Sequence, residues 1–305
     1  MADPLAEIVN LLRPSATFTK LVESAGTWAV HRRELGRPYY CAVLEGSVRL
    51  VIDGATPIVL EAGDFVLVPF ARTFIKSSLD VDPVKPVIAD LPTEIRPGVF
   101  RLGRREGAPD TRQLLGYGRF GSADAPLLTS LLPPVIHVRG EARLTTLVQL
   151  IDGETRADRP ARDVVLTHLL EVLMIEALRA TAEASPPPGL LRGLADKRLA
   201  AALRLMHARP AEPWSVVRLA EAAGLSRSAF FERFRRGVGL APMDYLLGWR
   251  MTLAKERLRL GMRVGEVARQ AGYSSTSTFS VAFARYCGLP PSAFARTTPD
   301  ADAAE

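Results

Sequence analysis

The chain has 305 residues, of which 48% are hydrophobic and 24% are charged, as in an ordinary globular protein. At roughly 100–200 residues per domain, this length favours two domains. The N-terminus lacks a basic segment followed by an apolar run, and no apolar stretch is long enough to cross a bilayer. We therefore expect a cytoplasmic protein with no membrane partner. With two cysteines, Cys41 and Cys287, a disulfide scaffold and a cysteine-based structural zinc site are excluded.

The charge of the chain is concentrated in one part of it. Residues 189–296 hold 18 Lys and Arg against 7 Asp and Glu, a net charge of +11. Residues 1–188 have a net charge of −2, and the last nine residues add three acids. A basic C-terminal segment suggests an anionic partner such as nucleic acid, although a basic solvated face is also common.

The first half of the chain is predicted to be rich in β-strands. Short β-type runs alternate with turn signals at Gly36, Gly46, Gly54 and Gly63. The predicted strands are 28–32, 39–44, 48–53, 58–60 and 65–68, followed by a returning strand at 111–120. This pattern favours an antiparallel sandwich or small barrel. Residues 79–110 show little periodicity and are predicted to form a long loop with at most one short helix.

Two helices and a linker are predicted next. Apolar residues recur at helical spacing in 141–152 and 162–183. Three consecutive prolines in 184–189 cannot lie inside a helix or a central strand, so they mark a linker. The domain boundaries that follow are 1–185, a linker at 186–190, and 191–305 with a short acidic tail. The fold class is a two-domain α+β protein whose second domain is all-α.

The second domain contains the same unit twice. Leu219-Ala220 and Ala223-Gly224 recur 48 residues later as Val267-Ala268 and Ala271-Gly272. After one extra residue the match continues, with an offset of 49, from Phe230, Phe234, Arg236, Gly239, Pro242 and Tyr245 to Phe279, Phe283, Arg285, Gly288, Pro291 and Phe294. Matches at this many positions, several of them Gly or Pro, indicate a duplication.

Each copy is predicted to be a helix-turn-helix. In the first copy a helix at 216–223 ends at Gly224, and Ser226 caps the next helix. In the second copy Gly272 ends the first helix, and Ser274 or Ser275 caps the second. An ordinary pair of antiparallel helices is the alternative. The duplication, the positive charge and the serine caps together favour DNA binding, in which the second helix enters the major groove.

These motifs resemble a known family. The stretch SRSAFFERFRRGVGLAPMDYLLGWRMTLAKERL and the later VGEVARQAGYSSTSTFSVAFARYCGLPPSAF are similar to the paired helix-turn-helix domain of AraC/XylS-type transcription regulators. The resemblance covers residues 198–296. It implies that a long helix at 241–260 joins the two units, and that their recognition helices enter successive major grooves about 34 Å apart.

The resemblance also implies which residues face DNA. The base-reading positions correspond to Ser228, Phe231 and Glu232 in the first recognition helix, and to Thr276, Ser277, Ser280 and Val281 in the second, with Ser275 at its start. Many relatives have arginine where this chain has Val281, so the second helix lacks a bidentate guanine contact. The candidate phosphate contacts are Arg227, Arg235, Arg236, Arg250 and Arg285. For each of these arginines a solvated helix face is the alternative.

The first domain resembles a cupin. Val43-Leu44-Glu45-Gly46 is typical of the end of a first cupin motif, and Gly63-x5-Pro69-x-Ala71-x2-Phe74 follows the second. Cupin enzymes hold a metal with histidines and a glutamate. Here Tyr39 stands at the glutamate position and Phe74 at the histidine position of the second motif, while no His-x-His pair lies near residues 32–35. We therefore expect no metal, no cofactor and no enzymatic activity.

Without a metal, the barrel would suit a small apolar or aromatic effector. The candidate effector-binding residues are Trp28, Tyr39, Cys41, Phe65 and Phe74, and the alternative is that they only fill the core. Cys41 would act as a redox sensor only if its thiol had a lowered pKa and some exposure. Helices in the position of 162–183 mediate pairing in AraC-like regulators, so a homodimer is expected through this helix, with packing inside the domain as the alternative.

The function predicted from the sequence is that of a sequence-specific regulator of transcription. It would bind promoter DNA under the control of a small-molecule or redox effector, and as an activator it would also contact RNA polymerase. Two alternatives remain at this point. One is a cupin metal enzyme fused to a DNA-binding domain, and the other is a constitutive DNA-binding protein whose barrel is a scaffold.

Overall fold

The computed structural model describes residues 3–33, 37–70, 73–81, 91–122, 125–157, 159–182 and 189–296. It contains two compact units, one of residues Ile8–Pro187 and one of Met1–Glu7 with Pro188–Glu305. The predicted linker of residues 186–190, with its three prolines, lies outside the described residues except for Gly189 and for Leu190, the first residue of a helix. Among the described residues, no helix is both long and apolar enough to span a bilayer.

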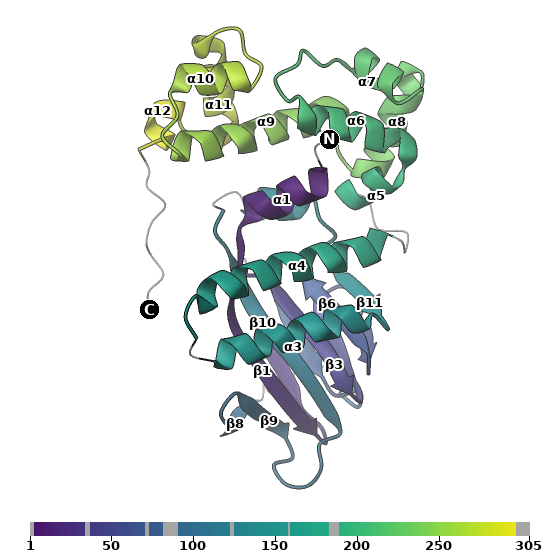
Figure 1. Cartoon of the computed structure of the whole chain (residues 1–305). Coiled ribbons are helices and arrows are strands. Elements are labelled where there is room, and N and C mark those ends of the chain that lie inside the picture. Colours follow the sequence, from purple (N-terminus) through teal and green to yellow (C-terminus); the bar gives the residue numbers. More distant parts are fainter. Residues whose placement is uncertain are drawn as a thin grey trace. The chain divides into compact units, whose positions relative to one another are not determined.

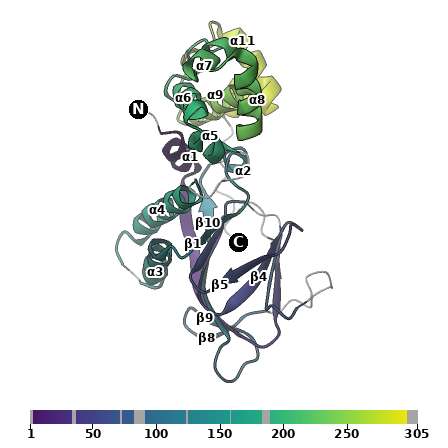
Figure 2. The same ribbon diagram turned by 90° about the vertical axis from the view of Figure 1, so that its right-hand side faces the viewer.

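The unit of residues 8–187 is built on two β-sheets. The larger sheet has the strand order β11 (Ile136–Arg139), β6 (Asp64–Val68), β3 (Tyr39–Glu45), β10 (Thr111–Phe120), β1 (Pro14–Ala25), β9 (Val99–Gly103) and β8 (Thr93–Arg96). The smaller sheet has the order β2 (Ala29–Arg32), β7 (Phe74–Ser77), β4 (Ser47–Ile52) and β5 (Ile58–Glu61). Neighbouring strands are antiparallel except for β1 and β9. In Figure 2, β4 and β5 stand opposite the strands of the larger sheet.

The core of this unit lies between the sheets. Alternate residues of each strand point into it, as the period-2 geometry of a strand requires. On β3 these are Tyr39, Cys41 and Val43, and on β4 they are Val48, Leu50 and Ile52. The predicted strands between residues 28 and 68 and the returning strand at 111–120 are confirmed, with ends that differ by one or two residues.

Two long helices cover the outer face of the larger sheet. Helices α3 (Ala142–Arg156) and α4 (Arg162–Ala182) lie side by side over β1, β3 and β10 (Figure 1). Helix α4 buries Leu166, Leu170, Leu173 and Met174, so much of its wide apolar stripe is covered within the unit. Two shorter helices, α1 (Pro4–Leu12) and α2 (Ala125–Ser130), precede β1 and β11. Both long helices were predicted, with nearly the same bounds.

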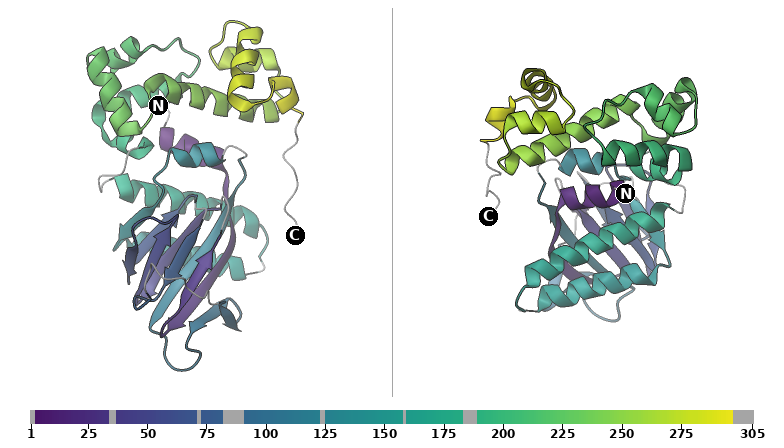
Figure 3. Two further views of the ribbon diagram at one scale, coloured as in Figure 1. Left: turned by 180° about the vertical axis from the view of Figure 1, so that it is seen from behind. Right: turned by 45° about the horizontal axis from the view of Figure 1, so that its top comes forward.

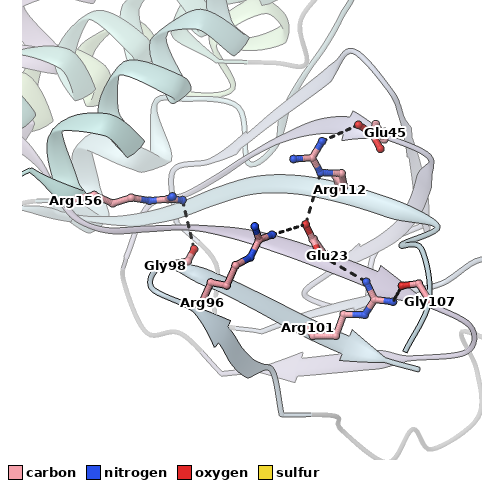
Figure 4. Close-up of polar contacts among 8 residues, drawn as sticks. All are labelled: Glu23, Glu45, Arg96, Gly98, Arg101, Gly107, Arg112 and Arg156. Carbon is pink, nitrogen blue, oxygen red and sulfur yellow. Dashed lines mark hydrogen bonds and ion pairs between the residues drawn. The ribbon is translucent and has the colours of Figure 1, made fainter. Parts of the chain in front are cut away.

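The prediction of a long loop at 79–110 is wrong in its second half, where β8 and β9 form an antiparallel pair. Polar contacts explain why hydrophobic patterning missed them (Figure 4). Glu23 of β1, largely buried, lies within 3.4 Å of Arg96 on β8 and 3.7 Å of Arg101 on β9. Arg112 of β10 contacts Glu23 at 3.9 Å and Glu45 of β3 at 2.8 Å. Charged residues therefore interrupt the apolar residues of β8 and β9, of which Phe100 and Leu102 pack against the core.

The second unit is all helical. Its helices are α5 (Leu190–Ala195), α6 (Lys197–Ala208), α7 (Val216–Ala222), α8 (Arg227–Val238), α9 (Pro242–Arg259), α10 (Val264–Gln270), α11 (Thr276–Cys287) and α12 (Pro291–Phe294). Helix α9 runs between a group formed by α5 to α8 and a group formed by α10 to α12 (Figure 3). This is the predicted duplication, with one long helix shared by both copies. Trp249 and Tyr245 of α9 are buried.

Candidate functional site

The two repeats fold into equivalent helix-turn-helix units. In the first, Gly224 has φ +62° and ends α7, and the Ser226 hydroxyl accepts a hydrogen bond from the Ala229 amide at the start of α8. In the second, Gly272 has φ +81° after α10, and Ser275 caps α11 by accepting from the Thr278 amide. A left-handed glycine followed by a serine cap makes a sharp turn between two helices and satisfies free backbone amides.

Buried phenylalanines hold each second helix against its core. Phe230 and Phe234 of α8 are fully buried, and their ring centroids lie 5.5 Å apart. Phe279 and Phe283 of α11 repeat this arrangement at the same distance. Because these residues are four apart, they occupy one face of each helix, and the opposite faces are left for solvent or a ligand.

The exposed face of α8 carries the residues of the first recognition helix that are predicted to contact DNA. Arg227, Ser228, Glu232 and Arg235 are exposed, and Phe231 is partly exposed. Beside them lies a groove of about 710 Å³, lined by Val216, Ser226, Arg227, Ser228, Phe231 and Glu232. The structure therefore brings the predicted base-reading residues of the first helix together on one accessible surface.

The exposed face of α11 carries no acidic side chain, and some of its hydroxyl groups are engaged within the helix. Val281 is 71% exposed, and Thr276, Ser277 and Arg285 are also exposed. The Ser280 hydroxyl donates to the Thr276 carbonyl at 2.8 Å. The Ser275 hydroxyl acts as the helix cap and lies 3.0 Å from the Ser277 hydroxyl. Ser275 and Ser280 are therefore already engaged in hydrogen bonds within the helix.

A second groove of about 870 Å³ lies along α11 and includes residues that the sequence did not single out. Its lining consists of Leu247, Tyr273, Ser277, Thr278, Val281, Ala282, Arg285 and Tyr286. The repeat pattern could not have identified Leu247 and Tyr286, because a position in a repeat does not say which exposed side chains border a groove.

Among the arginines predicted to contact phosphate, Arg250 makes hydrogen bonds to the protein's own backbone. Its guanidinium donates to the carbonyl of Pro210 at 2.6 Å and to the carbonyl of Glu212 at 2.7 Å. The side chain is half-buried and ties the segment before α7 to α9, so two of its guanidinium nitrogens are engaged within the protein. Arg227, Arg235, Arg236 and Arg285 are exposed, as a phosphate contact requires.

Four of the five predicted effector residues lie together in the barrel interior. Trp28, Tyr39, Cys41 and Phe74 belong to one buried cluster, and the Tyr39 ring stacks on the Phe74 ring with centroids 4.8 Å apart. Phe65 lies elsewhere. It pairs with Ala42 on β3, one residue from the inward-pointing Cys41, so its side chain points to the opposite face of the sheet.

The surroundings of Cys41 do not favour a reactive thiol. The residue is fully buried, and burial raises the pKa of the Cys41 thiol above its usual value. Its sulfur lies 3.9 Å from the Gln113 Oε1 atom. A thiol of raised pKa is mostly protonated near neutral pH and reacts slowly with oxidants.

Three basic residues in the barrel interior escaped the sequence analysis. Lys20 on β1, Arg32 on β2 and Lys76 on β7 each lie two residues from an inward-pointing neighbour. The signal was available for Lys76, because it follows Phe74 at the spacing that places two strand residues on one face. Within the described ranges, no group of three or more His, Cys, Asp or Glu is placed to hold a metal ion.

Comparisons with known proteins cover both units. The family described as "Cupin" matches residues 3–183, and the family described as "Helix-turn-helix domain" matches residues 219–297. A putative AraC-like transcription regulator of Streptomyces lividans is 34% identical, over 95% of this chain and 96% of the relative. The transcriptional activator RclR of Escherichia coli K12, described as RCS-specific, is 25% identical over 95% of each chain.

Among solved structures, the DNA-binding domain of AdpA in complex with a target DNA is 29% identical. It covers 32% of this chain and 88% of its own, with a TM-score of 0.30. The cupin match spans more than half of the chain, and the Streptomyces lividans relative is similar along nearly its whole length. From these two findings we conclude that the chain belongs to the AraC-like transcription regulators, with a cupin domain followed by a DNA-binding helix-turn-helix domain.

Proposed function

We propose that α8 and α11 bind successive major grooves of promoter DNA and that α8 provides most of the base reading. The observation that carries this proposal is the pair of capped recognition helices, each anchored by two buried phenylalanines and open on the opposite face. A rigid pair of this kind would contact sites about one helical turn apart on one side of the duplex.

The two helices differ in the contacts they can offer to bases. On α8, Glu232 can accept a hydrogen bond from the amino group of cytosine, and Phe231 can contact the methyl group of thymine. On α11, Val281 offers only an apolar contact, and the hydroxyls of Ser275 and Ser280 are engaged within the helix. We therefore expect a recognition site with one well-defined half and one degenerate half.

Selection of bound sequences from random DNA tests this proposal directly. The full-length protein is used at about 0.1 M salt, and the recovered motif should have two halves about one helical turn apart. In Glu232→Gln the preference for cytosine at one position of the strong half should weaken, because the amide is a poorer acceptor and is also a donor. Glu221→Gln, an exposed acid on α7, is the matched control and should leave the motif unchanged. If Glu232→Gln and the control recover the wild-type motif alike, α8 does not read this base.

We also propose that the barrel binds a small-molecule effector and has no enzymatic role. The buried aromatic cluster of Trp28, Tyr39 and Phe74 supports binding of an apolar or aromatic group. The burial of Cys41 argues for a small molecule over a redox signal. The protein would act in the cytoplasm as an activator, in contact with RNA polymerase at the promoter. Stoichiometric iron, manganese or zinc in the purified protein would instead favour an enzyme.

A homodimer through α4 is the third part of this proposal. Val164, Val165 and Val172 of α4 remain exposed after the helix has packed on its own sheet, with Val164 at 57%. Glutamate in place of Val165 and Val172 should convert a dimer to a monomer, as measured by sedimentation of the full chain. Val59→Glu, at an exposed position of β5, is the control. A wild-type protein that sediments as a monomer, alone and with DNA, would remove this part of the proposal.

A further inference from the structure

Three basic side chains lie in the interior of a barrel that is otherwise mostly apolar. Lys20, Arg32 and Lys76 extend from three different strands, each at an inward-facing position. Lys20 is 9% exposed and Lys76 is 3% exposed. Arg32 pairs directly with Phe74 across the antiparallel β2 and β7, so the two side chains lie on the same face.

Within the described parts of the chain, no carboxylate lies within ion-pair distance of these three groups. The Nζ atom of Lys76 lies 3.4 Å from the Tyr39 hydroxyl. The Nζ atom of Lys20 lies over the ring of Phe100, 4.6 Å from its centroid. Three residues further along β1, in contrast, Glu23 forms ion pairs with three arginines, so those cations have a carboxylate partner (Figure 4).

Burial of unpaired cations is unfavourable. Burial and the nearby charges of Arg32 and Lys76 lower the pKa of Lys20 to about 8, and burial also lowers the pKa of Lys76. Buried charges in proteins are generally paired or bound to an ion. An anion placed among these three groups would relieve both the loss of hydration and their mutual repulsion.

The surrounding side chains indicate what kind of anion fits. The rings of Tyr39, Phe74 and Tyr117 lie next to one another, with Tyr39 centred 4.8 Å from Phe74 and 5.5 Å from Tyr117. Burial raises the pKa of the Tyr39 hydroxyl, which therefore stays protonated and can donate a hydrogen bond to an oxygen atom. The cluster extends to the surface at Phe18, which is 39% exposed. The centroid of the Phe18 ring lies 5.5 Å from the Nζ atom of Lys20.

We propose that Lys20, Arg32 and Lys76 bind the carboxylate of a small organic acid whose apolar chain or ring lies against Tyr39 and Phe74. Basic groups with no carboxylate partner among the described residues supply the charge, and the aromatic rings supply the apolar contact. This inference rests on the proposed function, because it names the chemical class of the effector that the barrel would take.

Pairs of acids and alcohols of equal length test the site in the full-length protein. The probes are 4-phenylbutanoate against 4-phenylbutanol, and hexanoate against hexanol, with binding measured by calorimetry. We expect an acid to bind at least about tenfold more tightly than its alcohol, because a hydrogen bond between charged groups contributes at least that factor to the affinity. In Lys76→Met and in Lys20→Met the preference for the acid should be lost. Lys197→Met, at an exposed lysine of α6, is the matched control. Methionine replaces a buried cation by an apolar chain of similar length, so both variants should fold.

Equal binding of acids and alcohols to the wild-type protein would overturn the proposal, and so would variants that retain the preference. DNA binding measured with the same probes tests effector control separately. If DNA binding responds to the alcohols as strongly as to the acids, the barrel controls DNA binding and the carboxylate site is wrong. If Lys76→Met abolishes acid binding but no probe changes DNA binding in the wild type, the site is supported and effector control fails.

Discussion

The turn glycines of the two helix-turn-helix units occupy equivalent positions but have different surroundings. Gly224 has φ +62° and open space where a β-carbon would project. Gly272 has φ +81°, and a β-carbon there would lie 2.6 Å from the Ala211 carbonyl oxygen. Alanine at either position adopts a left-handed conformation that costs roughly 1–2 kcal/mol. Only Gly272→Ala should also displace its neighbours.

The additional cost of Gly272→Ala can be estimated from the contacts around Ala211. The carbonyl must move by at least 0.4 Å for the β-carbon to reach a separation of 3.0 Å, the lower limit seen for real contacts. Two hydrogen bonds from Arg250, to Pro210 and to Glu212, hold that segment in place. Loss of one such bond to a charged group costs about 1.5–3 kcal/mol. We therefore expect Gly224→Ala to lower the free energy of unfolding by about 1–2 kcal/mol, and Gly272→Ala by about 2.5–5 kcal/mol.

Urea unfolding followed by tryptophan fluorescence measures this difference. The chain has three tryptophans, and Trp28 lies in the other unit. In a Trp28→Phe background the signal comes from Trp214 and Trp249, which both belong to the helical unit. With a slope of about 1–3 kcal/mol per molar urea, a difference of 2 kcal/mol separates the two midpoints by about 1 M. Midpoints that coincide for the two variants would show that the contact with Ala211 is not maintained in solution.

Three further predictions concern charge and reactivity. Arg235→Ala should reduce the slope of log affinity for DNA against log salt by about one, whereas an unchanged slope would exclude a phosphate contact. The pKa of Lys20 is about 8 in the folded protein against 10.5 as the ordinary value, so the unfolded chain binds more protons between these values. The free energy of unfolding should therefore rise from pH 8 toward pH 10.5, and it should rise less in Lys20→Met. Urea unfolding with the same pH dependence in both proteins would contradict this prediction. Iodoacetamide at neutral pH should modify the partly exposed Cys287 before Cys41, as mass spectrometry would detect, and the reverse order would revive a redox role for Cys41.

The accuracy of the sequence predictions depended on the kind of contact that holds each element. Strands β3 to β6 bury alternate apolar residues and end at turns, so hydrophobic periodicity and turn residues were sufficient to predict them. Strand β1 was not predicted, because its inward positions include Lys20 and a register shift between Ala16 and Phe18 interrupts the alternation. Strands β8 and β9 were not predicted, because Arg96 and Arg101, which pair with Glu23, interrupt their short apolar runs.

The candidate sites show the same limit. The duplication located both recognition helices and their caps, because spacing alone determines which residues share a helix face. Spacing does not determine whether an arginine predicted to be exposed contacts solvent or donates a hydrogen bond to a backbone carbonyl. Arg250 sits on a predicted helix in a basic domain, and only the folding of the segment around Pro210 reveals its structural role. Lys76 was missed because β7 itself was not predicted, although its two-residue spacing from Phe74 was a signal that could have placed it on the inward face.

The two recognition helices carry the same fold but different chemistry, and this difference bears on how specificity could be divided between them. The core positions Phe230 and Phe234 recur as Phe279 and Phe283, so packing constrains both helices equally. The outward faces are not constrained in this way, and only α8 presents an exposed carboxylate next to arginines. Because α11 lacks a carboxylate that could select cytosine, we infer that it reads fewer bases than α8 and mainly adds affinity and fixes orientation.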